Sequence, residues 1–275
     1  MKLLHKPFPM SVRPDVPKGG EHVDQVETPK PAASQSGRAV QRVLPRVLDR
    51  TASRGRRARR LRRKLRPAAY AYTDIGGALF EQPTRENFVA FNTVGYHVTV
   101  LMDRLMVRAL AQTAEMLDDE VATGLAVYLD RHLIEEAHHA EVGGLTLEDM
   151  GTIGVDPDTI RNSPCPTEID GLRESMFERL AKHPVAVLGF LQLEQLHSTV
   201  EGVDAMIEAT GLPRSAFRST ELHAHLDRGH ASELDRMMDT LALERWHERL
   251  IYKSAVLSIA AVRSASLAIF ERPRR

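Results

Sequence analysis

The stretch ELHAHLDRGH, residues 221–230, contains three of the 12 histidines in this 275-residue chain. On an α-helix, which turns by about 100° per residue, His223, Asp227 and His230 fall within about 40° of one another. His225 points to the opposite side. Two imidazoles and a carboxylate on one helical stripe suit a transition metal, and they are poorly suited to an apolar core. The stretch therefore predicts a helix that carries metal ligands into a helical bundle.

A second stretch, DRHLIEEAHHAE at residues 130–141, repeats this spacing. His132, Glu136 and His139 form the pattern H-x3-E-x2-H, and Glu135 lies at the edge of the same stripe. Each of these histidines taken alone is more typical of a helix surface or of a hydrogen-bonded core position. Two matched stripes are far less expected by chance, so the prediction of a metal site depends on the pair.

A further carboxylate stands in an apolar segment. Glu194 follows nine residues without any charge, residues 185–193. A buried carboxylate or imidazolium without a partner costs several kcal/mol, and a group of them would exceed the ~5–15 kcal/mol that stabilises a typical domain. Bound metal ions remove this cost, and helical bundles that project Glu, Asp and His inward hold two iron or manganese ions. A carboxylate-rich set suits iron better than zinc.

The rest of the sequence predicts an all-α domain. Apolar residues recur at three- and four-residue steps, and no segment shows sustained strand-like alternation. Thr84 is a suitable N-cap, the pair Gly143-Gly144 should weaken a helix, and Gly211 should end one. The expected helices span residues 84–114, 118–151, 172–183, 184–211, 213–242 and 243–273.

Residues 1–72 are predicted to be a disordered basic tail in front of a helical domain at residues 73–275. The whole chain balances 37 basic against 37 acidic residues, but residues 1–66 hold 18 basic and 5 acidic ones. Proline, serine and charge dominate the first part of the tail, and large apolar residues are few there.

Arginine dominates residues 54–66, which could alternatively form a basic helix that ends near Pro67. Such a segment is typical of contact with nucleic acid or an anionic surface. No aromatic residue lies among the arginines before Tyr70. This favours contact with the acidic body of the chain itself over nucleic acid.

The single cysteine, Cys165, excludes an internal disulfide, and the sequence contains no apolar run of about 18 residues. We therefore expect a cytoplasmic protein that does not span a membrane. The acidic body and the apolar C-terminal helix are compatible with a homodimer.

The motifs resemble those of the haem-oxygenase-like di-iron oxidases and oxygenases over roughly residues 85–270. HLIEEAHHAE (132–141) is similar to the first ligand helix of that family, AVLGFLQLEQLHSTV (186–200) to the helix that donates one glutamate, and HAHLDRGH (223–230) to the closing H-x3-[DE]-x2-H motif. The resemblance implies a bundle of about seven helices that binds two irons without haem. The ligands that it implies are Glu136, His139, Glu194, His223, Asp227 and His230.

Three more residues are expected as further ligands or as side chains that orient the ligands: His132, Glu135 and His97. A separate ferritin-like family of N-oxygenases has a similar ligand order. Asp227 and the form of the C-terminal helices favour the haem-oxygenase-like fold.

The resemblance implies an enzyme in which two ferrous ions and O2 oxidise a small substrate, which we expect to be an amino acid or amine. N-oxygenation, desaturation and C–C cleavage all occur in this family, and an electron donor would be a further partner. Such an enzyme should keep its chemistry when residues 1–66 are deleted.

Two other classes of protein fit the same residues. One is a metal-free haem-oxygenase-like enzyme that uses His and Glu in acid–base chemistry, in which His132 and Glu135 would matter more than Asp227. The other is a non-enzymatic iron-binding bundle, whose consumption of O2 would not depend on any organic compound.

Overall fold

The computed structural model describes residues 55–139, 144–196 and 199–271. Within these ranges the side chains of residues 136–139, 227 and 228 lie outside the description. The described residues form helices joined by turns, and no strand occurs among them. The prediction of an all-α protein is confirmed.

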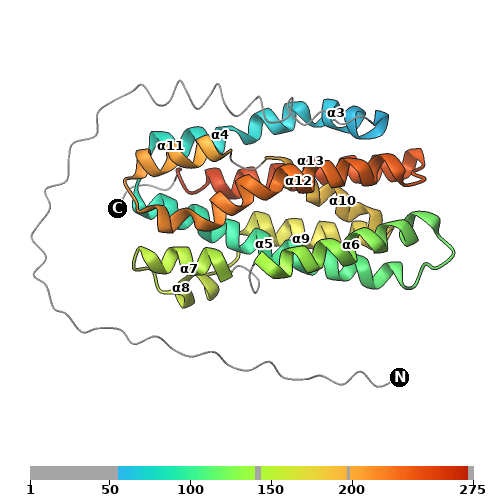
Figure 1. Cartoon of the computed structure of the whole chain (residues 1–275), viewed down its shortest axis with the longest axis horizontal. Helices are drawn as coiled ribbons and strands as arrows, with labels where there is room; N and C mark the ends of the chain where they lie inside the picture. Colours follow the sequence, from blue (N-terminus) through green and yellow to red (C-terminus); the bar gives the residue numbers. More distant parts are fainter. Residues whose placement is uncertain (1–54, 140–143, 197–198, 272–275) are drawn as a thin grey trace, which may run out of the picture. The chain divides into compact units, whose positions relative to one another are not determined.

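The axes of the long helices are roughly aligned with one another, and turns or shorter helices connect them (Figure 1). The longer helices are α3 (Arg56–Tyr72), α5 (Arg85–Thr113), α6 (Glu120–His139), α9 (Thr167–Leu180), α12 (Arg218–Thr240) and α13 (Arg245–Leu267). The shorter α-helices are α4 (Asp74–Glu81), α7 (Gly144–Thr152), α8 (Pro157–Arg161), α10 (Val187–Phe190) and α11 (Val200–Thr210). Three 3₁₀ helices complete the described part: η2 (Pro184–Ala186), η3 (Leu191–Leu196) and η4 (Arg214–Phe217).

Local signals in the sequence predicted several helix ends. The Thr84 hydroxyl accepts a hydrogen bond from the Asn87 N–H at 3.1 Å, and α5 begins directly after this cap. The segment expected as one helix over residues 118–151 contains α6 and α7, and residues 140–143 between them lie outside the described residues. Gly211 ends α11 with φ of 65°, a left-handed conformation that favours glycine.

The helix expected over residues 184–211 is not continuous, which corrects the sequence prediction. It is divided into η2, α10, η3 and α11, and Glu194 lies in η3. Apolar periodicity cannot distinguish a long helix from a series of short ones in a fully buried segment, because every face of such a segment is apolar.

Gly189 allows α10 to pack directly on α13. A Cβ atom at this position would lie 2.4 Å from the carbonyl oxygen of Ile251 and 2.5 Å from Cβ of Ser254. Both of these residues are fully buried, so α13 has little room to move away. The contact holds in place the segment that leads into η3 and therefore into Glu194.

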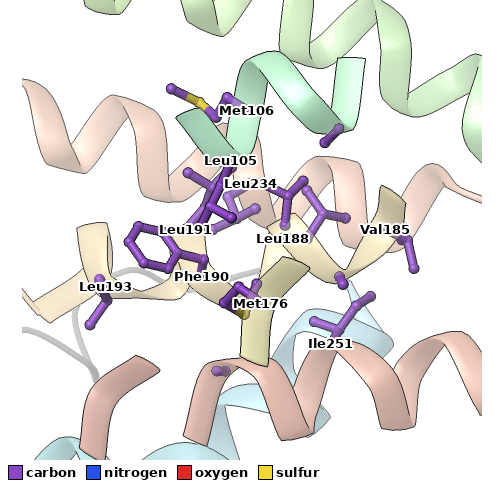
Figure 2. Packing of buried hydrophobic residues seen from close by; sticks show 14 of the residues in the cluster. Leu105, Met106, Met176, Val185, Leu188, Phe190, Leu191, Leu193, Leu234 and Ile251 are labelled. Carbon is purple, nitrogen blue, oxygen red and sulfur yellow. The ribbon is translucent and has the colours of Figure 1, made fainter. Parts of the chain in front are cut away.

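The main hydrophobic core lies between the long helices and the segment from η2 to η3. Leu105 and Met106 of α5, Leu188 of α10 and Leu234 of α12 belong to one cluster of completely buried side chains (Figure 2). This cluster packs against the elements that carry the predicted metal ligands, namely α6, η3 and α12.

The predicted disorder is wrong for residues 56–72, which form α3. Ala58, Leu61, Leu65 and Ala69 are buried on one face of this helix, which contacts α12 and α13. Pro67 lies inside the helix and does not end it. The three- and four-residue spacing of these apolar residues was hidden by the many arginines between them. Residues 1–54 lie outside the described residues.

A buried ion pair ties α3 to α12. Nε of Arg62 donates to Oδ1 of Asp235 at 3.0 Å, and a second guanidinium nitrogen pairs with Oδ2. Burial lowers the pKa of Arg62 to about 10. Removal of one partner would leave a buried charge, which costs ~3–5 kcal/mol. Deletion of residues 1–66 would remove most of α3 and the Arg62 side chain and should therefore destabilise the domain, whereas retention of its chemistry stays a prediction.

α13 is the one helix in the described part of the chain that is long and apolar enough to cross a membrane, with a mean hydropathy of 1.3 over its best window. Half of that window is buried inside the protein, and α13 contacts α3, α9 and α10. These contacts make it a core helix of the bundle.

Replacement of Leu65 by alanine tests whether α3 belongs to the folded body. We expect Leu65→Ala to lower the free energy of unfolding by about 2–5 kcal/mol, because the side chain is 5 % exposed. Urea denaturation would measure this. The exposed Arg63 provides the control, since Arg63→Ala should change stability by less than about 0.5 kcal/mol. Equal, small effects of both changes would contradict the packing of α3.

The close approach of α10 to α13 predicts the effect of a single methyl group. Gly189→Ala should destabilise the protein by about 1–3 kcal/mol, because the new Cβ would overlap the backbone of α13. Gly171 of α9 has open space around it, so Gly171→Ala should be neutral or stabilise by up to about 1 kcal/mol. Thermal melting of both variants would decide, and a neutral Gly189→Ala would show that the two helices do not touch there.

Candidate metal site

Three side chains from two helices converge in the interior of the bundle. His132 and Glu135 of α6 meet His230 of α12, and one possible ligand atom from each lies within 4.8 Å of the others. Oε2 of Glu135 is 4.0 Å from Nδ1 of His132 and 3.9 Å from Nε2 of His230. Two ligands that each lie about 2.1 Å from one metal ion are at most about 4.2 Å apart. Both distances meet this limit, so one ion could contact Glu135 together with either histidine.

Glu194 reaches the same group from η3, which packs against α12. Its Oε1 is 3.0 Å from Nε2 of His132, and the two residues are 5 % and 1 % exposed. Its other oxygen, Oε2, is buried and has no hydrogen-bond partner among the described residues. A buried carboxylate oxygen without a partner is unusual in a native protein, and a cation is a suitable partner for it.

The hydrogen bonds assign the tautomers of two histidines. A neutral imidazole has one N–H, and Nε2 of His132 uses it to donate to Glu194. In a neutral ring Nδ1 of His132 would then carry the lone pair, and this nitrogen is 4.0 Å from Oε2 of Glu135. Nδ1 of His223 donates to the Ser219 carbonyl oxygen at 2.7 Å, so Nε2 is the nitrogen of this ring that could bind a metal. A ligand histidine is usually oriented in this way, by a carboxylate or a backbone carbonyl.

Four of the residues predicted from the sequence come together in the structure: His132, Glu135, Glu194 and His230. His223 lies two turns before His230 on α12, about 10 Å away along the helix axis. Two members of the group, His132 and Glu135, are residues that the sequence indicated only as further ligands or orienting side chains.

The other predicted residues have different outcomes. His97 is 2.9 Å from the Ser163 hydroxyl through its Nε2 and is not a member of the group, so the structure assigns it no part in the site. Burial lowers the pKa of His97. The side chains of Glu136, His139 and Asp227 lie outside the described residues, and their role as ligands stays a prediction.

Tyr128 was not predicted from the sequence. Its ring stacks on His132, with 5.3 Å between the ring centroids and 15° between the planes. Burial, and after it the negative charge of Glu194, raises the pKa of the Tyr128 phenol well above its ordinary value. The spacing of four residues between Tyr128 and His132 is the signal that could have identified it, since it places both on one helix face.

A comparison with known proteins bears on the fold alone. No family model matches the sequence, and no curated protein matches it significantly. A crystal structure from Shewanella denitrificans OS217, described as a domain of unknown function with a haem-oxygenase-like fold, is similar, with a TM-score of 0.64. The match covers 77 % of this chain and 91 % of that domain at 17 % sequence identity. The chain has a haem-oxygenase-like fold.

This result confirms the predicted fold class. The similar domain from Shewanella denitrificans is itself described as having unknown function. At 17 % identity the structural similarity gives no evidence of an activity for this chain. Any function must therefore be argued from the side chains that the haem-oxygenase-like bundle holds in its interior.

A second group of possible ligands lies where α6, η2 and α13 begin. Asp119, His183 and His247 also offer atoms within 4.8 Å of one another. However, Nδ1 of His183 accepts the Val185 N–H, and Nδ1 of His247 accepts the Glu244 N–H, both at 3.1 Å. The proton of each neutral ring therefore lies on Nε2, where a metal would have to bind. We interpret this group as a junction of helix caps.

The junction predicts how stability depends on pH. Burial, as the largest cause, lowers the pKa of both His183 and His247 below their ordinary value of 6.5. Below pH 6.5 the two histidines bind protons in the unfolded chain but stay neutral in the folded chain until the pH reaches their lowered pKa values. The contribution of the two histidines to stability is therefore complete above pH 6.5 and is lost as the pH falls through the lowered pKa values.

We expect the free energy of unfolding to fall between pH 7.5 and pH 5.5, and to fall less in the double variant His183→Gln/His247→Gln. Urea denaturation at several pH values would measure both proteins. An equal or steeper dependence in the double variant would contradict the assignment of two neutral, buried imidazoles.

Proposed function

We propose that this protein is a non-haem di-iron oxidase or oxygenase that uses O2 to oxidise a small organic substrate. The observation that carries the proposal is the buried pair of His132 and Glu194, 3.0 Å apart, beside Glu135 and His230. Oε2 of Glu194 is buried without a hydrogen-bond partner among the described residues, and Glu135 approaches both His132 and His230.

The charges of the group favour a divalent cation. In its assigned tautomer His132 is neutral, whereas Glu194 is a buried carboxylate and Glu135 a half-exposed one. Nε of Arg131 is 3.6 Å from Glu135, but another nitrogen of Arg131 pairs with Glu233 at 2.5 Å, and the arginine is half exposed. Screening by solvent makes such a surface pair weak. Oε2 of Glu194 has no hydrogen-bond partner among the described residues, so a cation is a suitable partner for this buried carboxylate. Mixed carboxylate and imidazole ligands suit iron.

Bound iron would supply the reaction with O2, which amino-acid side chains cannot perform by themselves. The chain's own residues would hold the metals, fix their open positions and exclude water. Glu194 orients His132 through the N–H of that ring, and Tyr128 packs against its face. In this proposal an external electron donor completes the cycle, and the reaction takes place in the cytoplasm.

The same hydrogen bond favours a second candidate, a metal-free enzyme. A buried carboxylate that accepts the N–H of a histidine raises the basicity of the other ring nitrogen, which could then remove a proton from a substrate. Under this reading His132 would be the general base, and iron would have no effect on activity. Iron binding therefore separates the two candidates.

The test is the iron content per chain after anaerobic loading with ferrous ion and desalting. We expect about two irons per chain in the natural protein and at least about a tenfold loss of affinity in His132→Ala and Glu194→Gln. Glu194→Gln keeps an oxygen that can accept the His132 hydrogen bond but removes the charge. His97→Ala is the matched control, because this histidine pairs with Ser163 outside the group.

Circular dichroism would verify that each variant is folded. A folded natural protein that retains no iron would overturn the proposal and leave the acid–base candidate. Retained iron whose O2 consumption no organic compound changes would instead identify an iron-binding bundle without enzymatic function.

A further inference from the structure

A cavity of about 220 Å³ shares α12 and η3 with the candidate metal site, although none of His132, Glu135, Glu194 and His230 lines it. Its wall is formed by residues of α3, α4, α5, α7, η3, α11, α12 and α13, together with Thr73 between α3 and α4. His223 is part of this wall, and so is Leu196, two residues after Glu194. The cavity therefore adjoins both the histidine with the metal-binding tautomer and the segment that carries the buried carboxylate.

The described wall contains no lysine, arginine, aspartate or glutamate. Apolar side chains such as Leu79, Phe91 and Val262 supply much of it, and hydroxyl and amide groups supply the remainder. Burial raises the pKa of Tyr72, which also lines the cavity, to about 12, so its phenol stays neutral at physiological pH. Apart from the imidazole of His223, the described wall offers no ionisable group that could carry a charge opposite to that of a ligand at physiological pH.

Several of the polar groups already have partners within the chain. The Thr99 hydroxyl donates to the Gly95 carbonyl oxygen at 3.1 Å, and the Thr73 hydroxyl donates to that of Tyr70 at 2.7 Å. The Asn92 amide donates to the Phe88 carbonyl oxygen at 2.9 Å, which leaves its own oxygen as an acceptor for a ligand hydroxyl.

The size of the cavity limits its occupant. An apolar cavity of about 150 Å³ holds benzene. By proportion, 220 Å³ accommodates a molecule of about nine non-hydrogen atoms. This is smaller than the ~300–1,000 Å³ of sites that bind drug-sized ligands.

We propose that this cavity binds a small, uncharged and mostly apolar molecule with one hydrogen-bonding group, and that this molecule is the substrate. The second part rests on the proposed function. An ionised carboxylate or ammonium placed against this wall would lose its hydration, and the described wall has no lysine, arginine, aspartate or glutamate to pair with it, which costs several kcal/mol. The inference departs from the amino acid or amine that we expected from the sequence, because a free amino acid needs a cationic partner for its carboxylate.

Binding to the metal-free, full-length protein tests the inference with matched probes. One series has a phenyl ring (2-phenylethanol, 2-phenylethylamine and phenylacetate), and the other a linear chain (1-octanol, octylamine and octanoate). Within each series the carbon count is the same and the charge differs. We expect at least one alcohol to bind with 1:1 stoichiometry in ligand-observed NMR and calorimetry, at least about tenfold more tightly than its amine and carboxylate.

A glycine substitution locates the binding site. Gly95 lines the cavity, and a Cβ there would meet no atom within 4 Å, so Gly95→Met should abolish binding of the alcohol without lowering the melting temperature. Gly171→Met is the matched control, because Gly171 also lies in a helix with open space around it and does not line the cavity. This variant should bind as the natural protein does.

The inference is overturned if a charged probe binds as tightly as the alcohol of its series, if neither alcohol binds, or if Gly95→Met binds normally. None of these measurements uses iron. A protein that binds the alcohol but no iron would therefore refute the proposed function and support the cavity assignment. A protein that binds iron but no alcohol would support the proposed function and refute the cavity assignment.

Discussion

The hydrogen bond between His132 and Glu194 is the interaction on which the interior of this bundle depends. It joins α6 to η3 between two side chains that are almost completely buried, and it fixes which nitrogen of His132 carries the proton. Packing around this hydrogen bond fixes the position of η3. The absence of a side chain at Gly189 lets α10 pack closely on α13, and the core around Leu188 and Leu234 holds η3 beside α12. A haem-oxygenase-like fold supplies this frame, but the chemistry belongs to the side chains.

Two groups of histidines and carboxylates lie in the described part of the bundle, and the same residue types serve different purposes in them. In one group Nδ1 of His183 and of His247 accepts a backbone N–H, so the rings act as helix caps. In the other, His132 donates its N–H to the Glu194 carboxylate, and its other nitrogen is 4.0 Å from Glu135. Proximity alone does not distinguish a metal site from a structural junction, whereas the tautomer does.

Sequence patterns predicted the all-α fold and most of the helices, because caps, glycine pairs and apolar periodicity are local signals. They also identified His132, Glu135, Glu194 and His230, although not which of them lie in one contact group. The division of residues 184–211 into short helices, and the close contact of Gly189 with α13, involve tertiary packing that the sequence pattern does not show. α3 was missed because arginines obscured its apolar stripe, and the Ser163 partner of His97 comes from a distant segment.

The most direct test of the central claim is anomalous scattering at the iron edge from crystals grown anaerobically with ferrous ion. If His132, Glu135, Glu194 and His230 form a metal centre, anomalous density will lie within bonding distance of their side chains, and none will lie at Asp119, His183 and His247. Density at the second group, or a well-ordered protein without iron at the first, would contradict the assignment of this interior as a metal site.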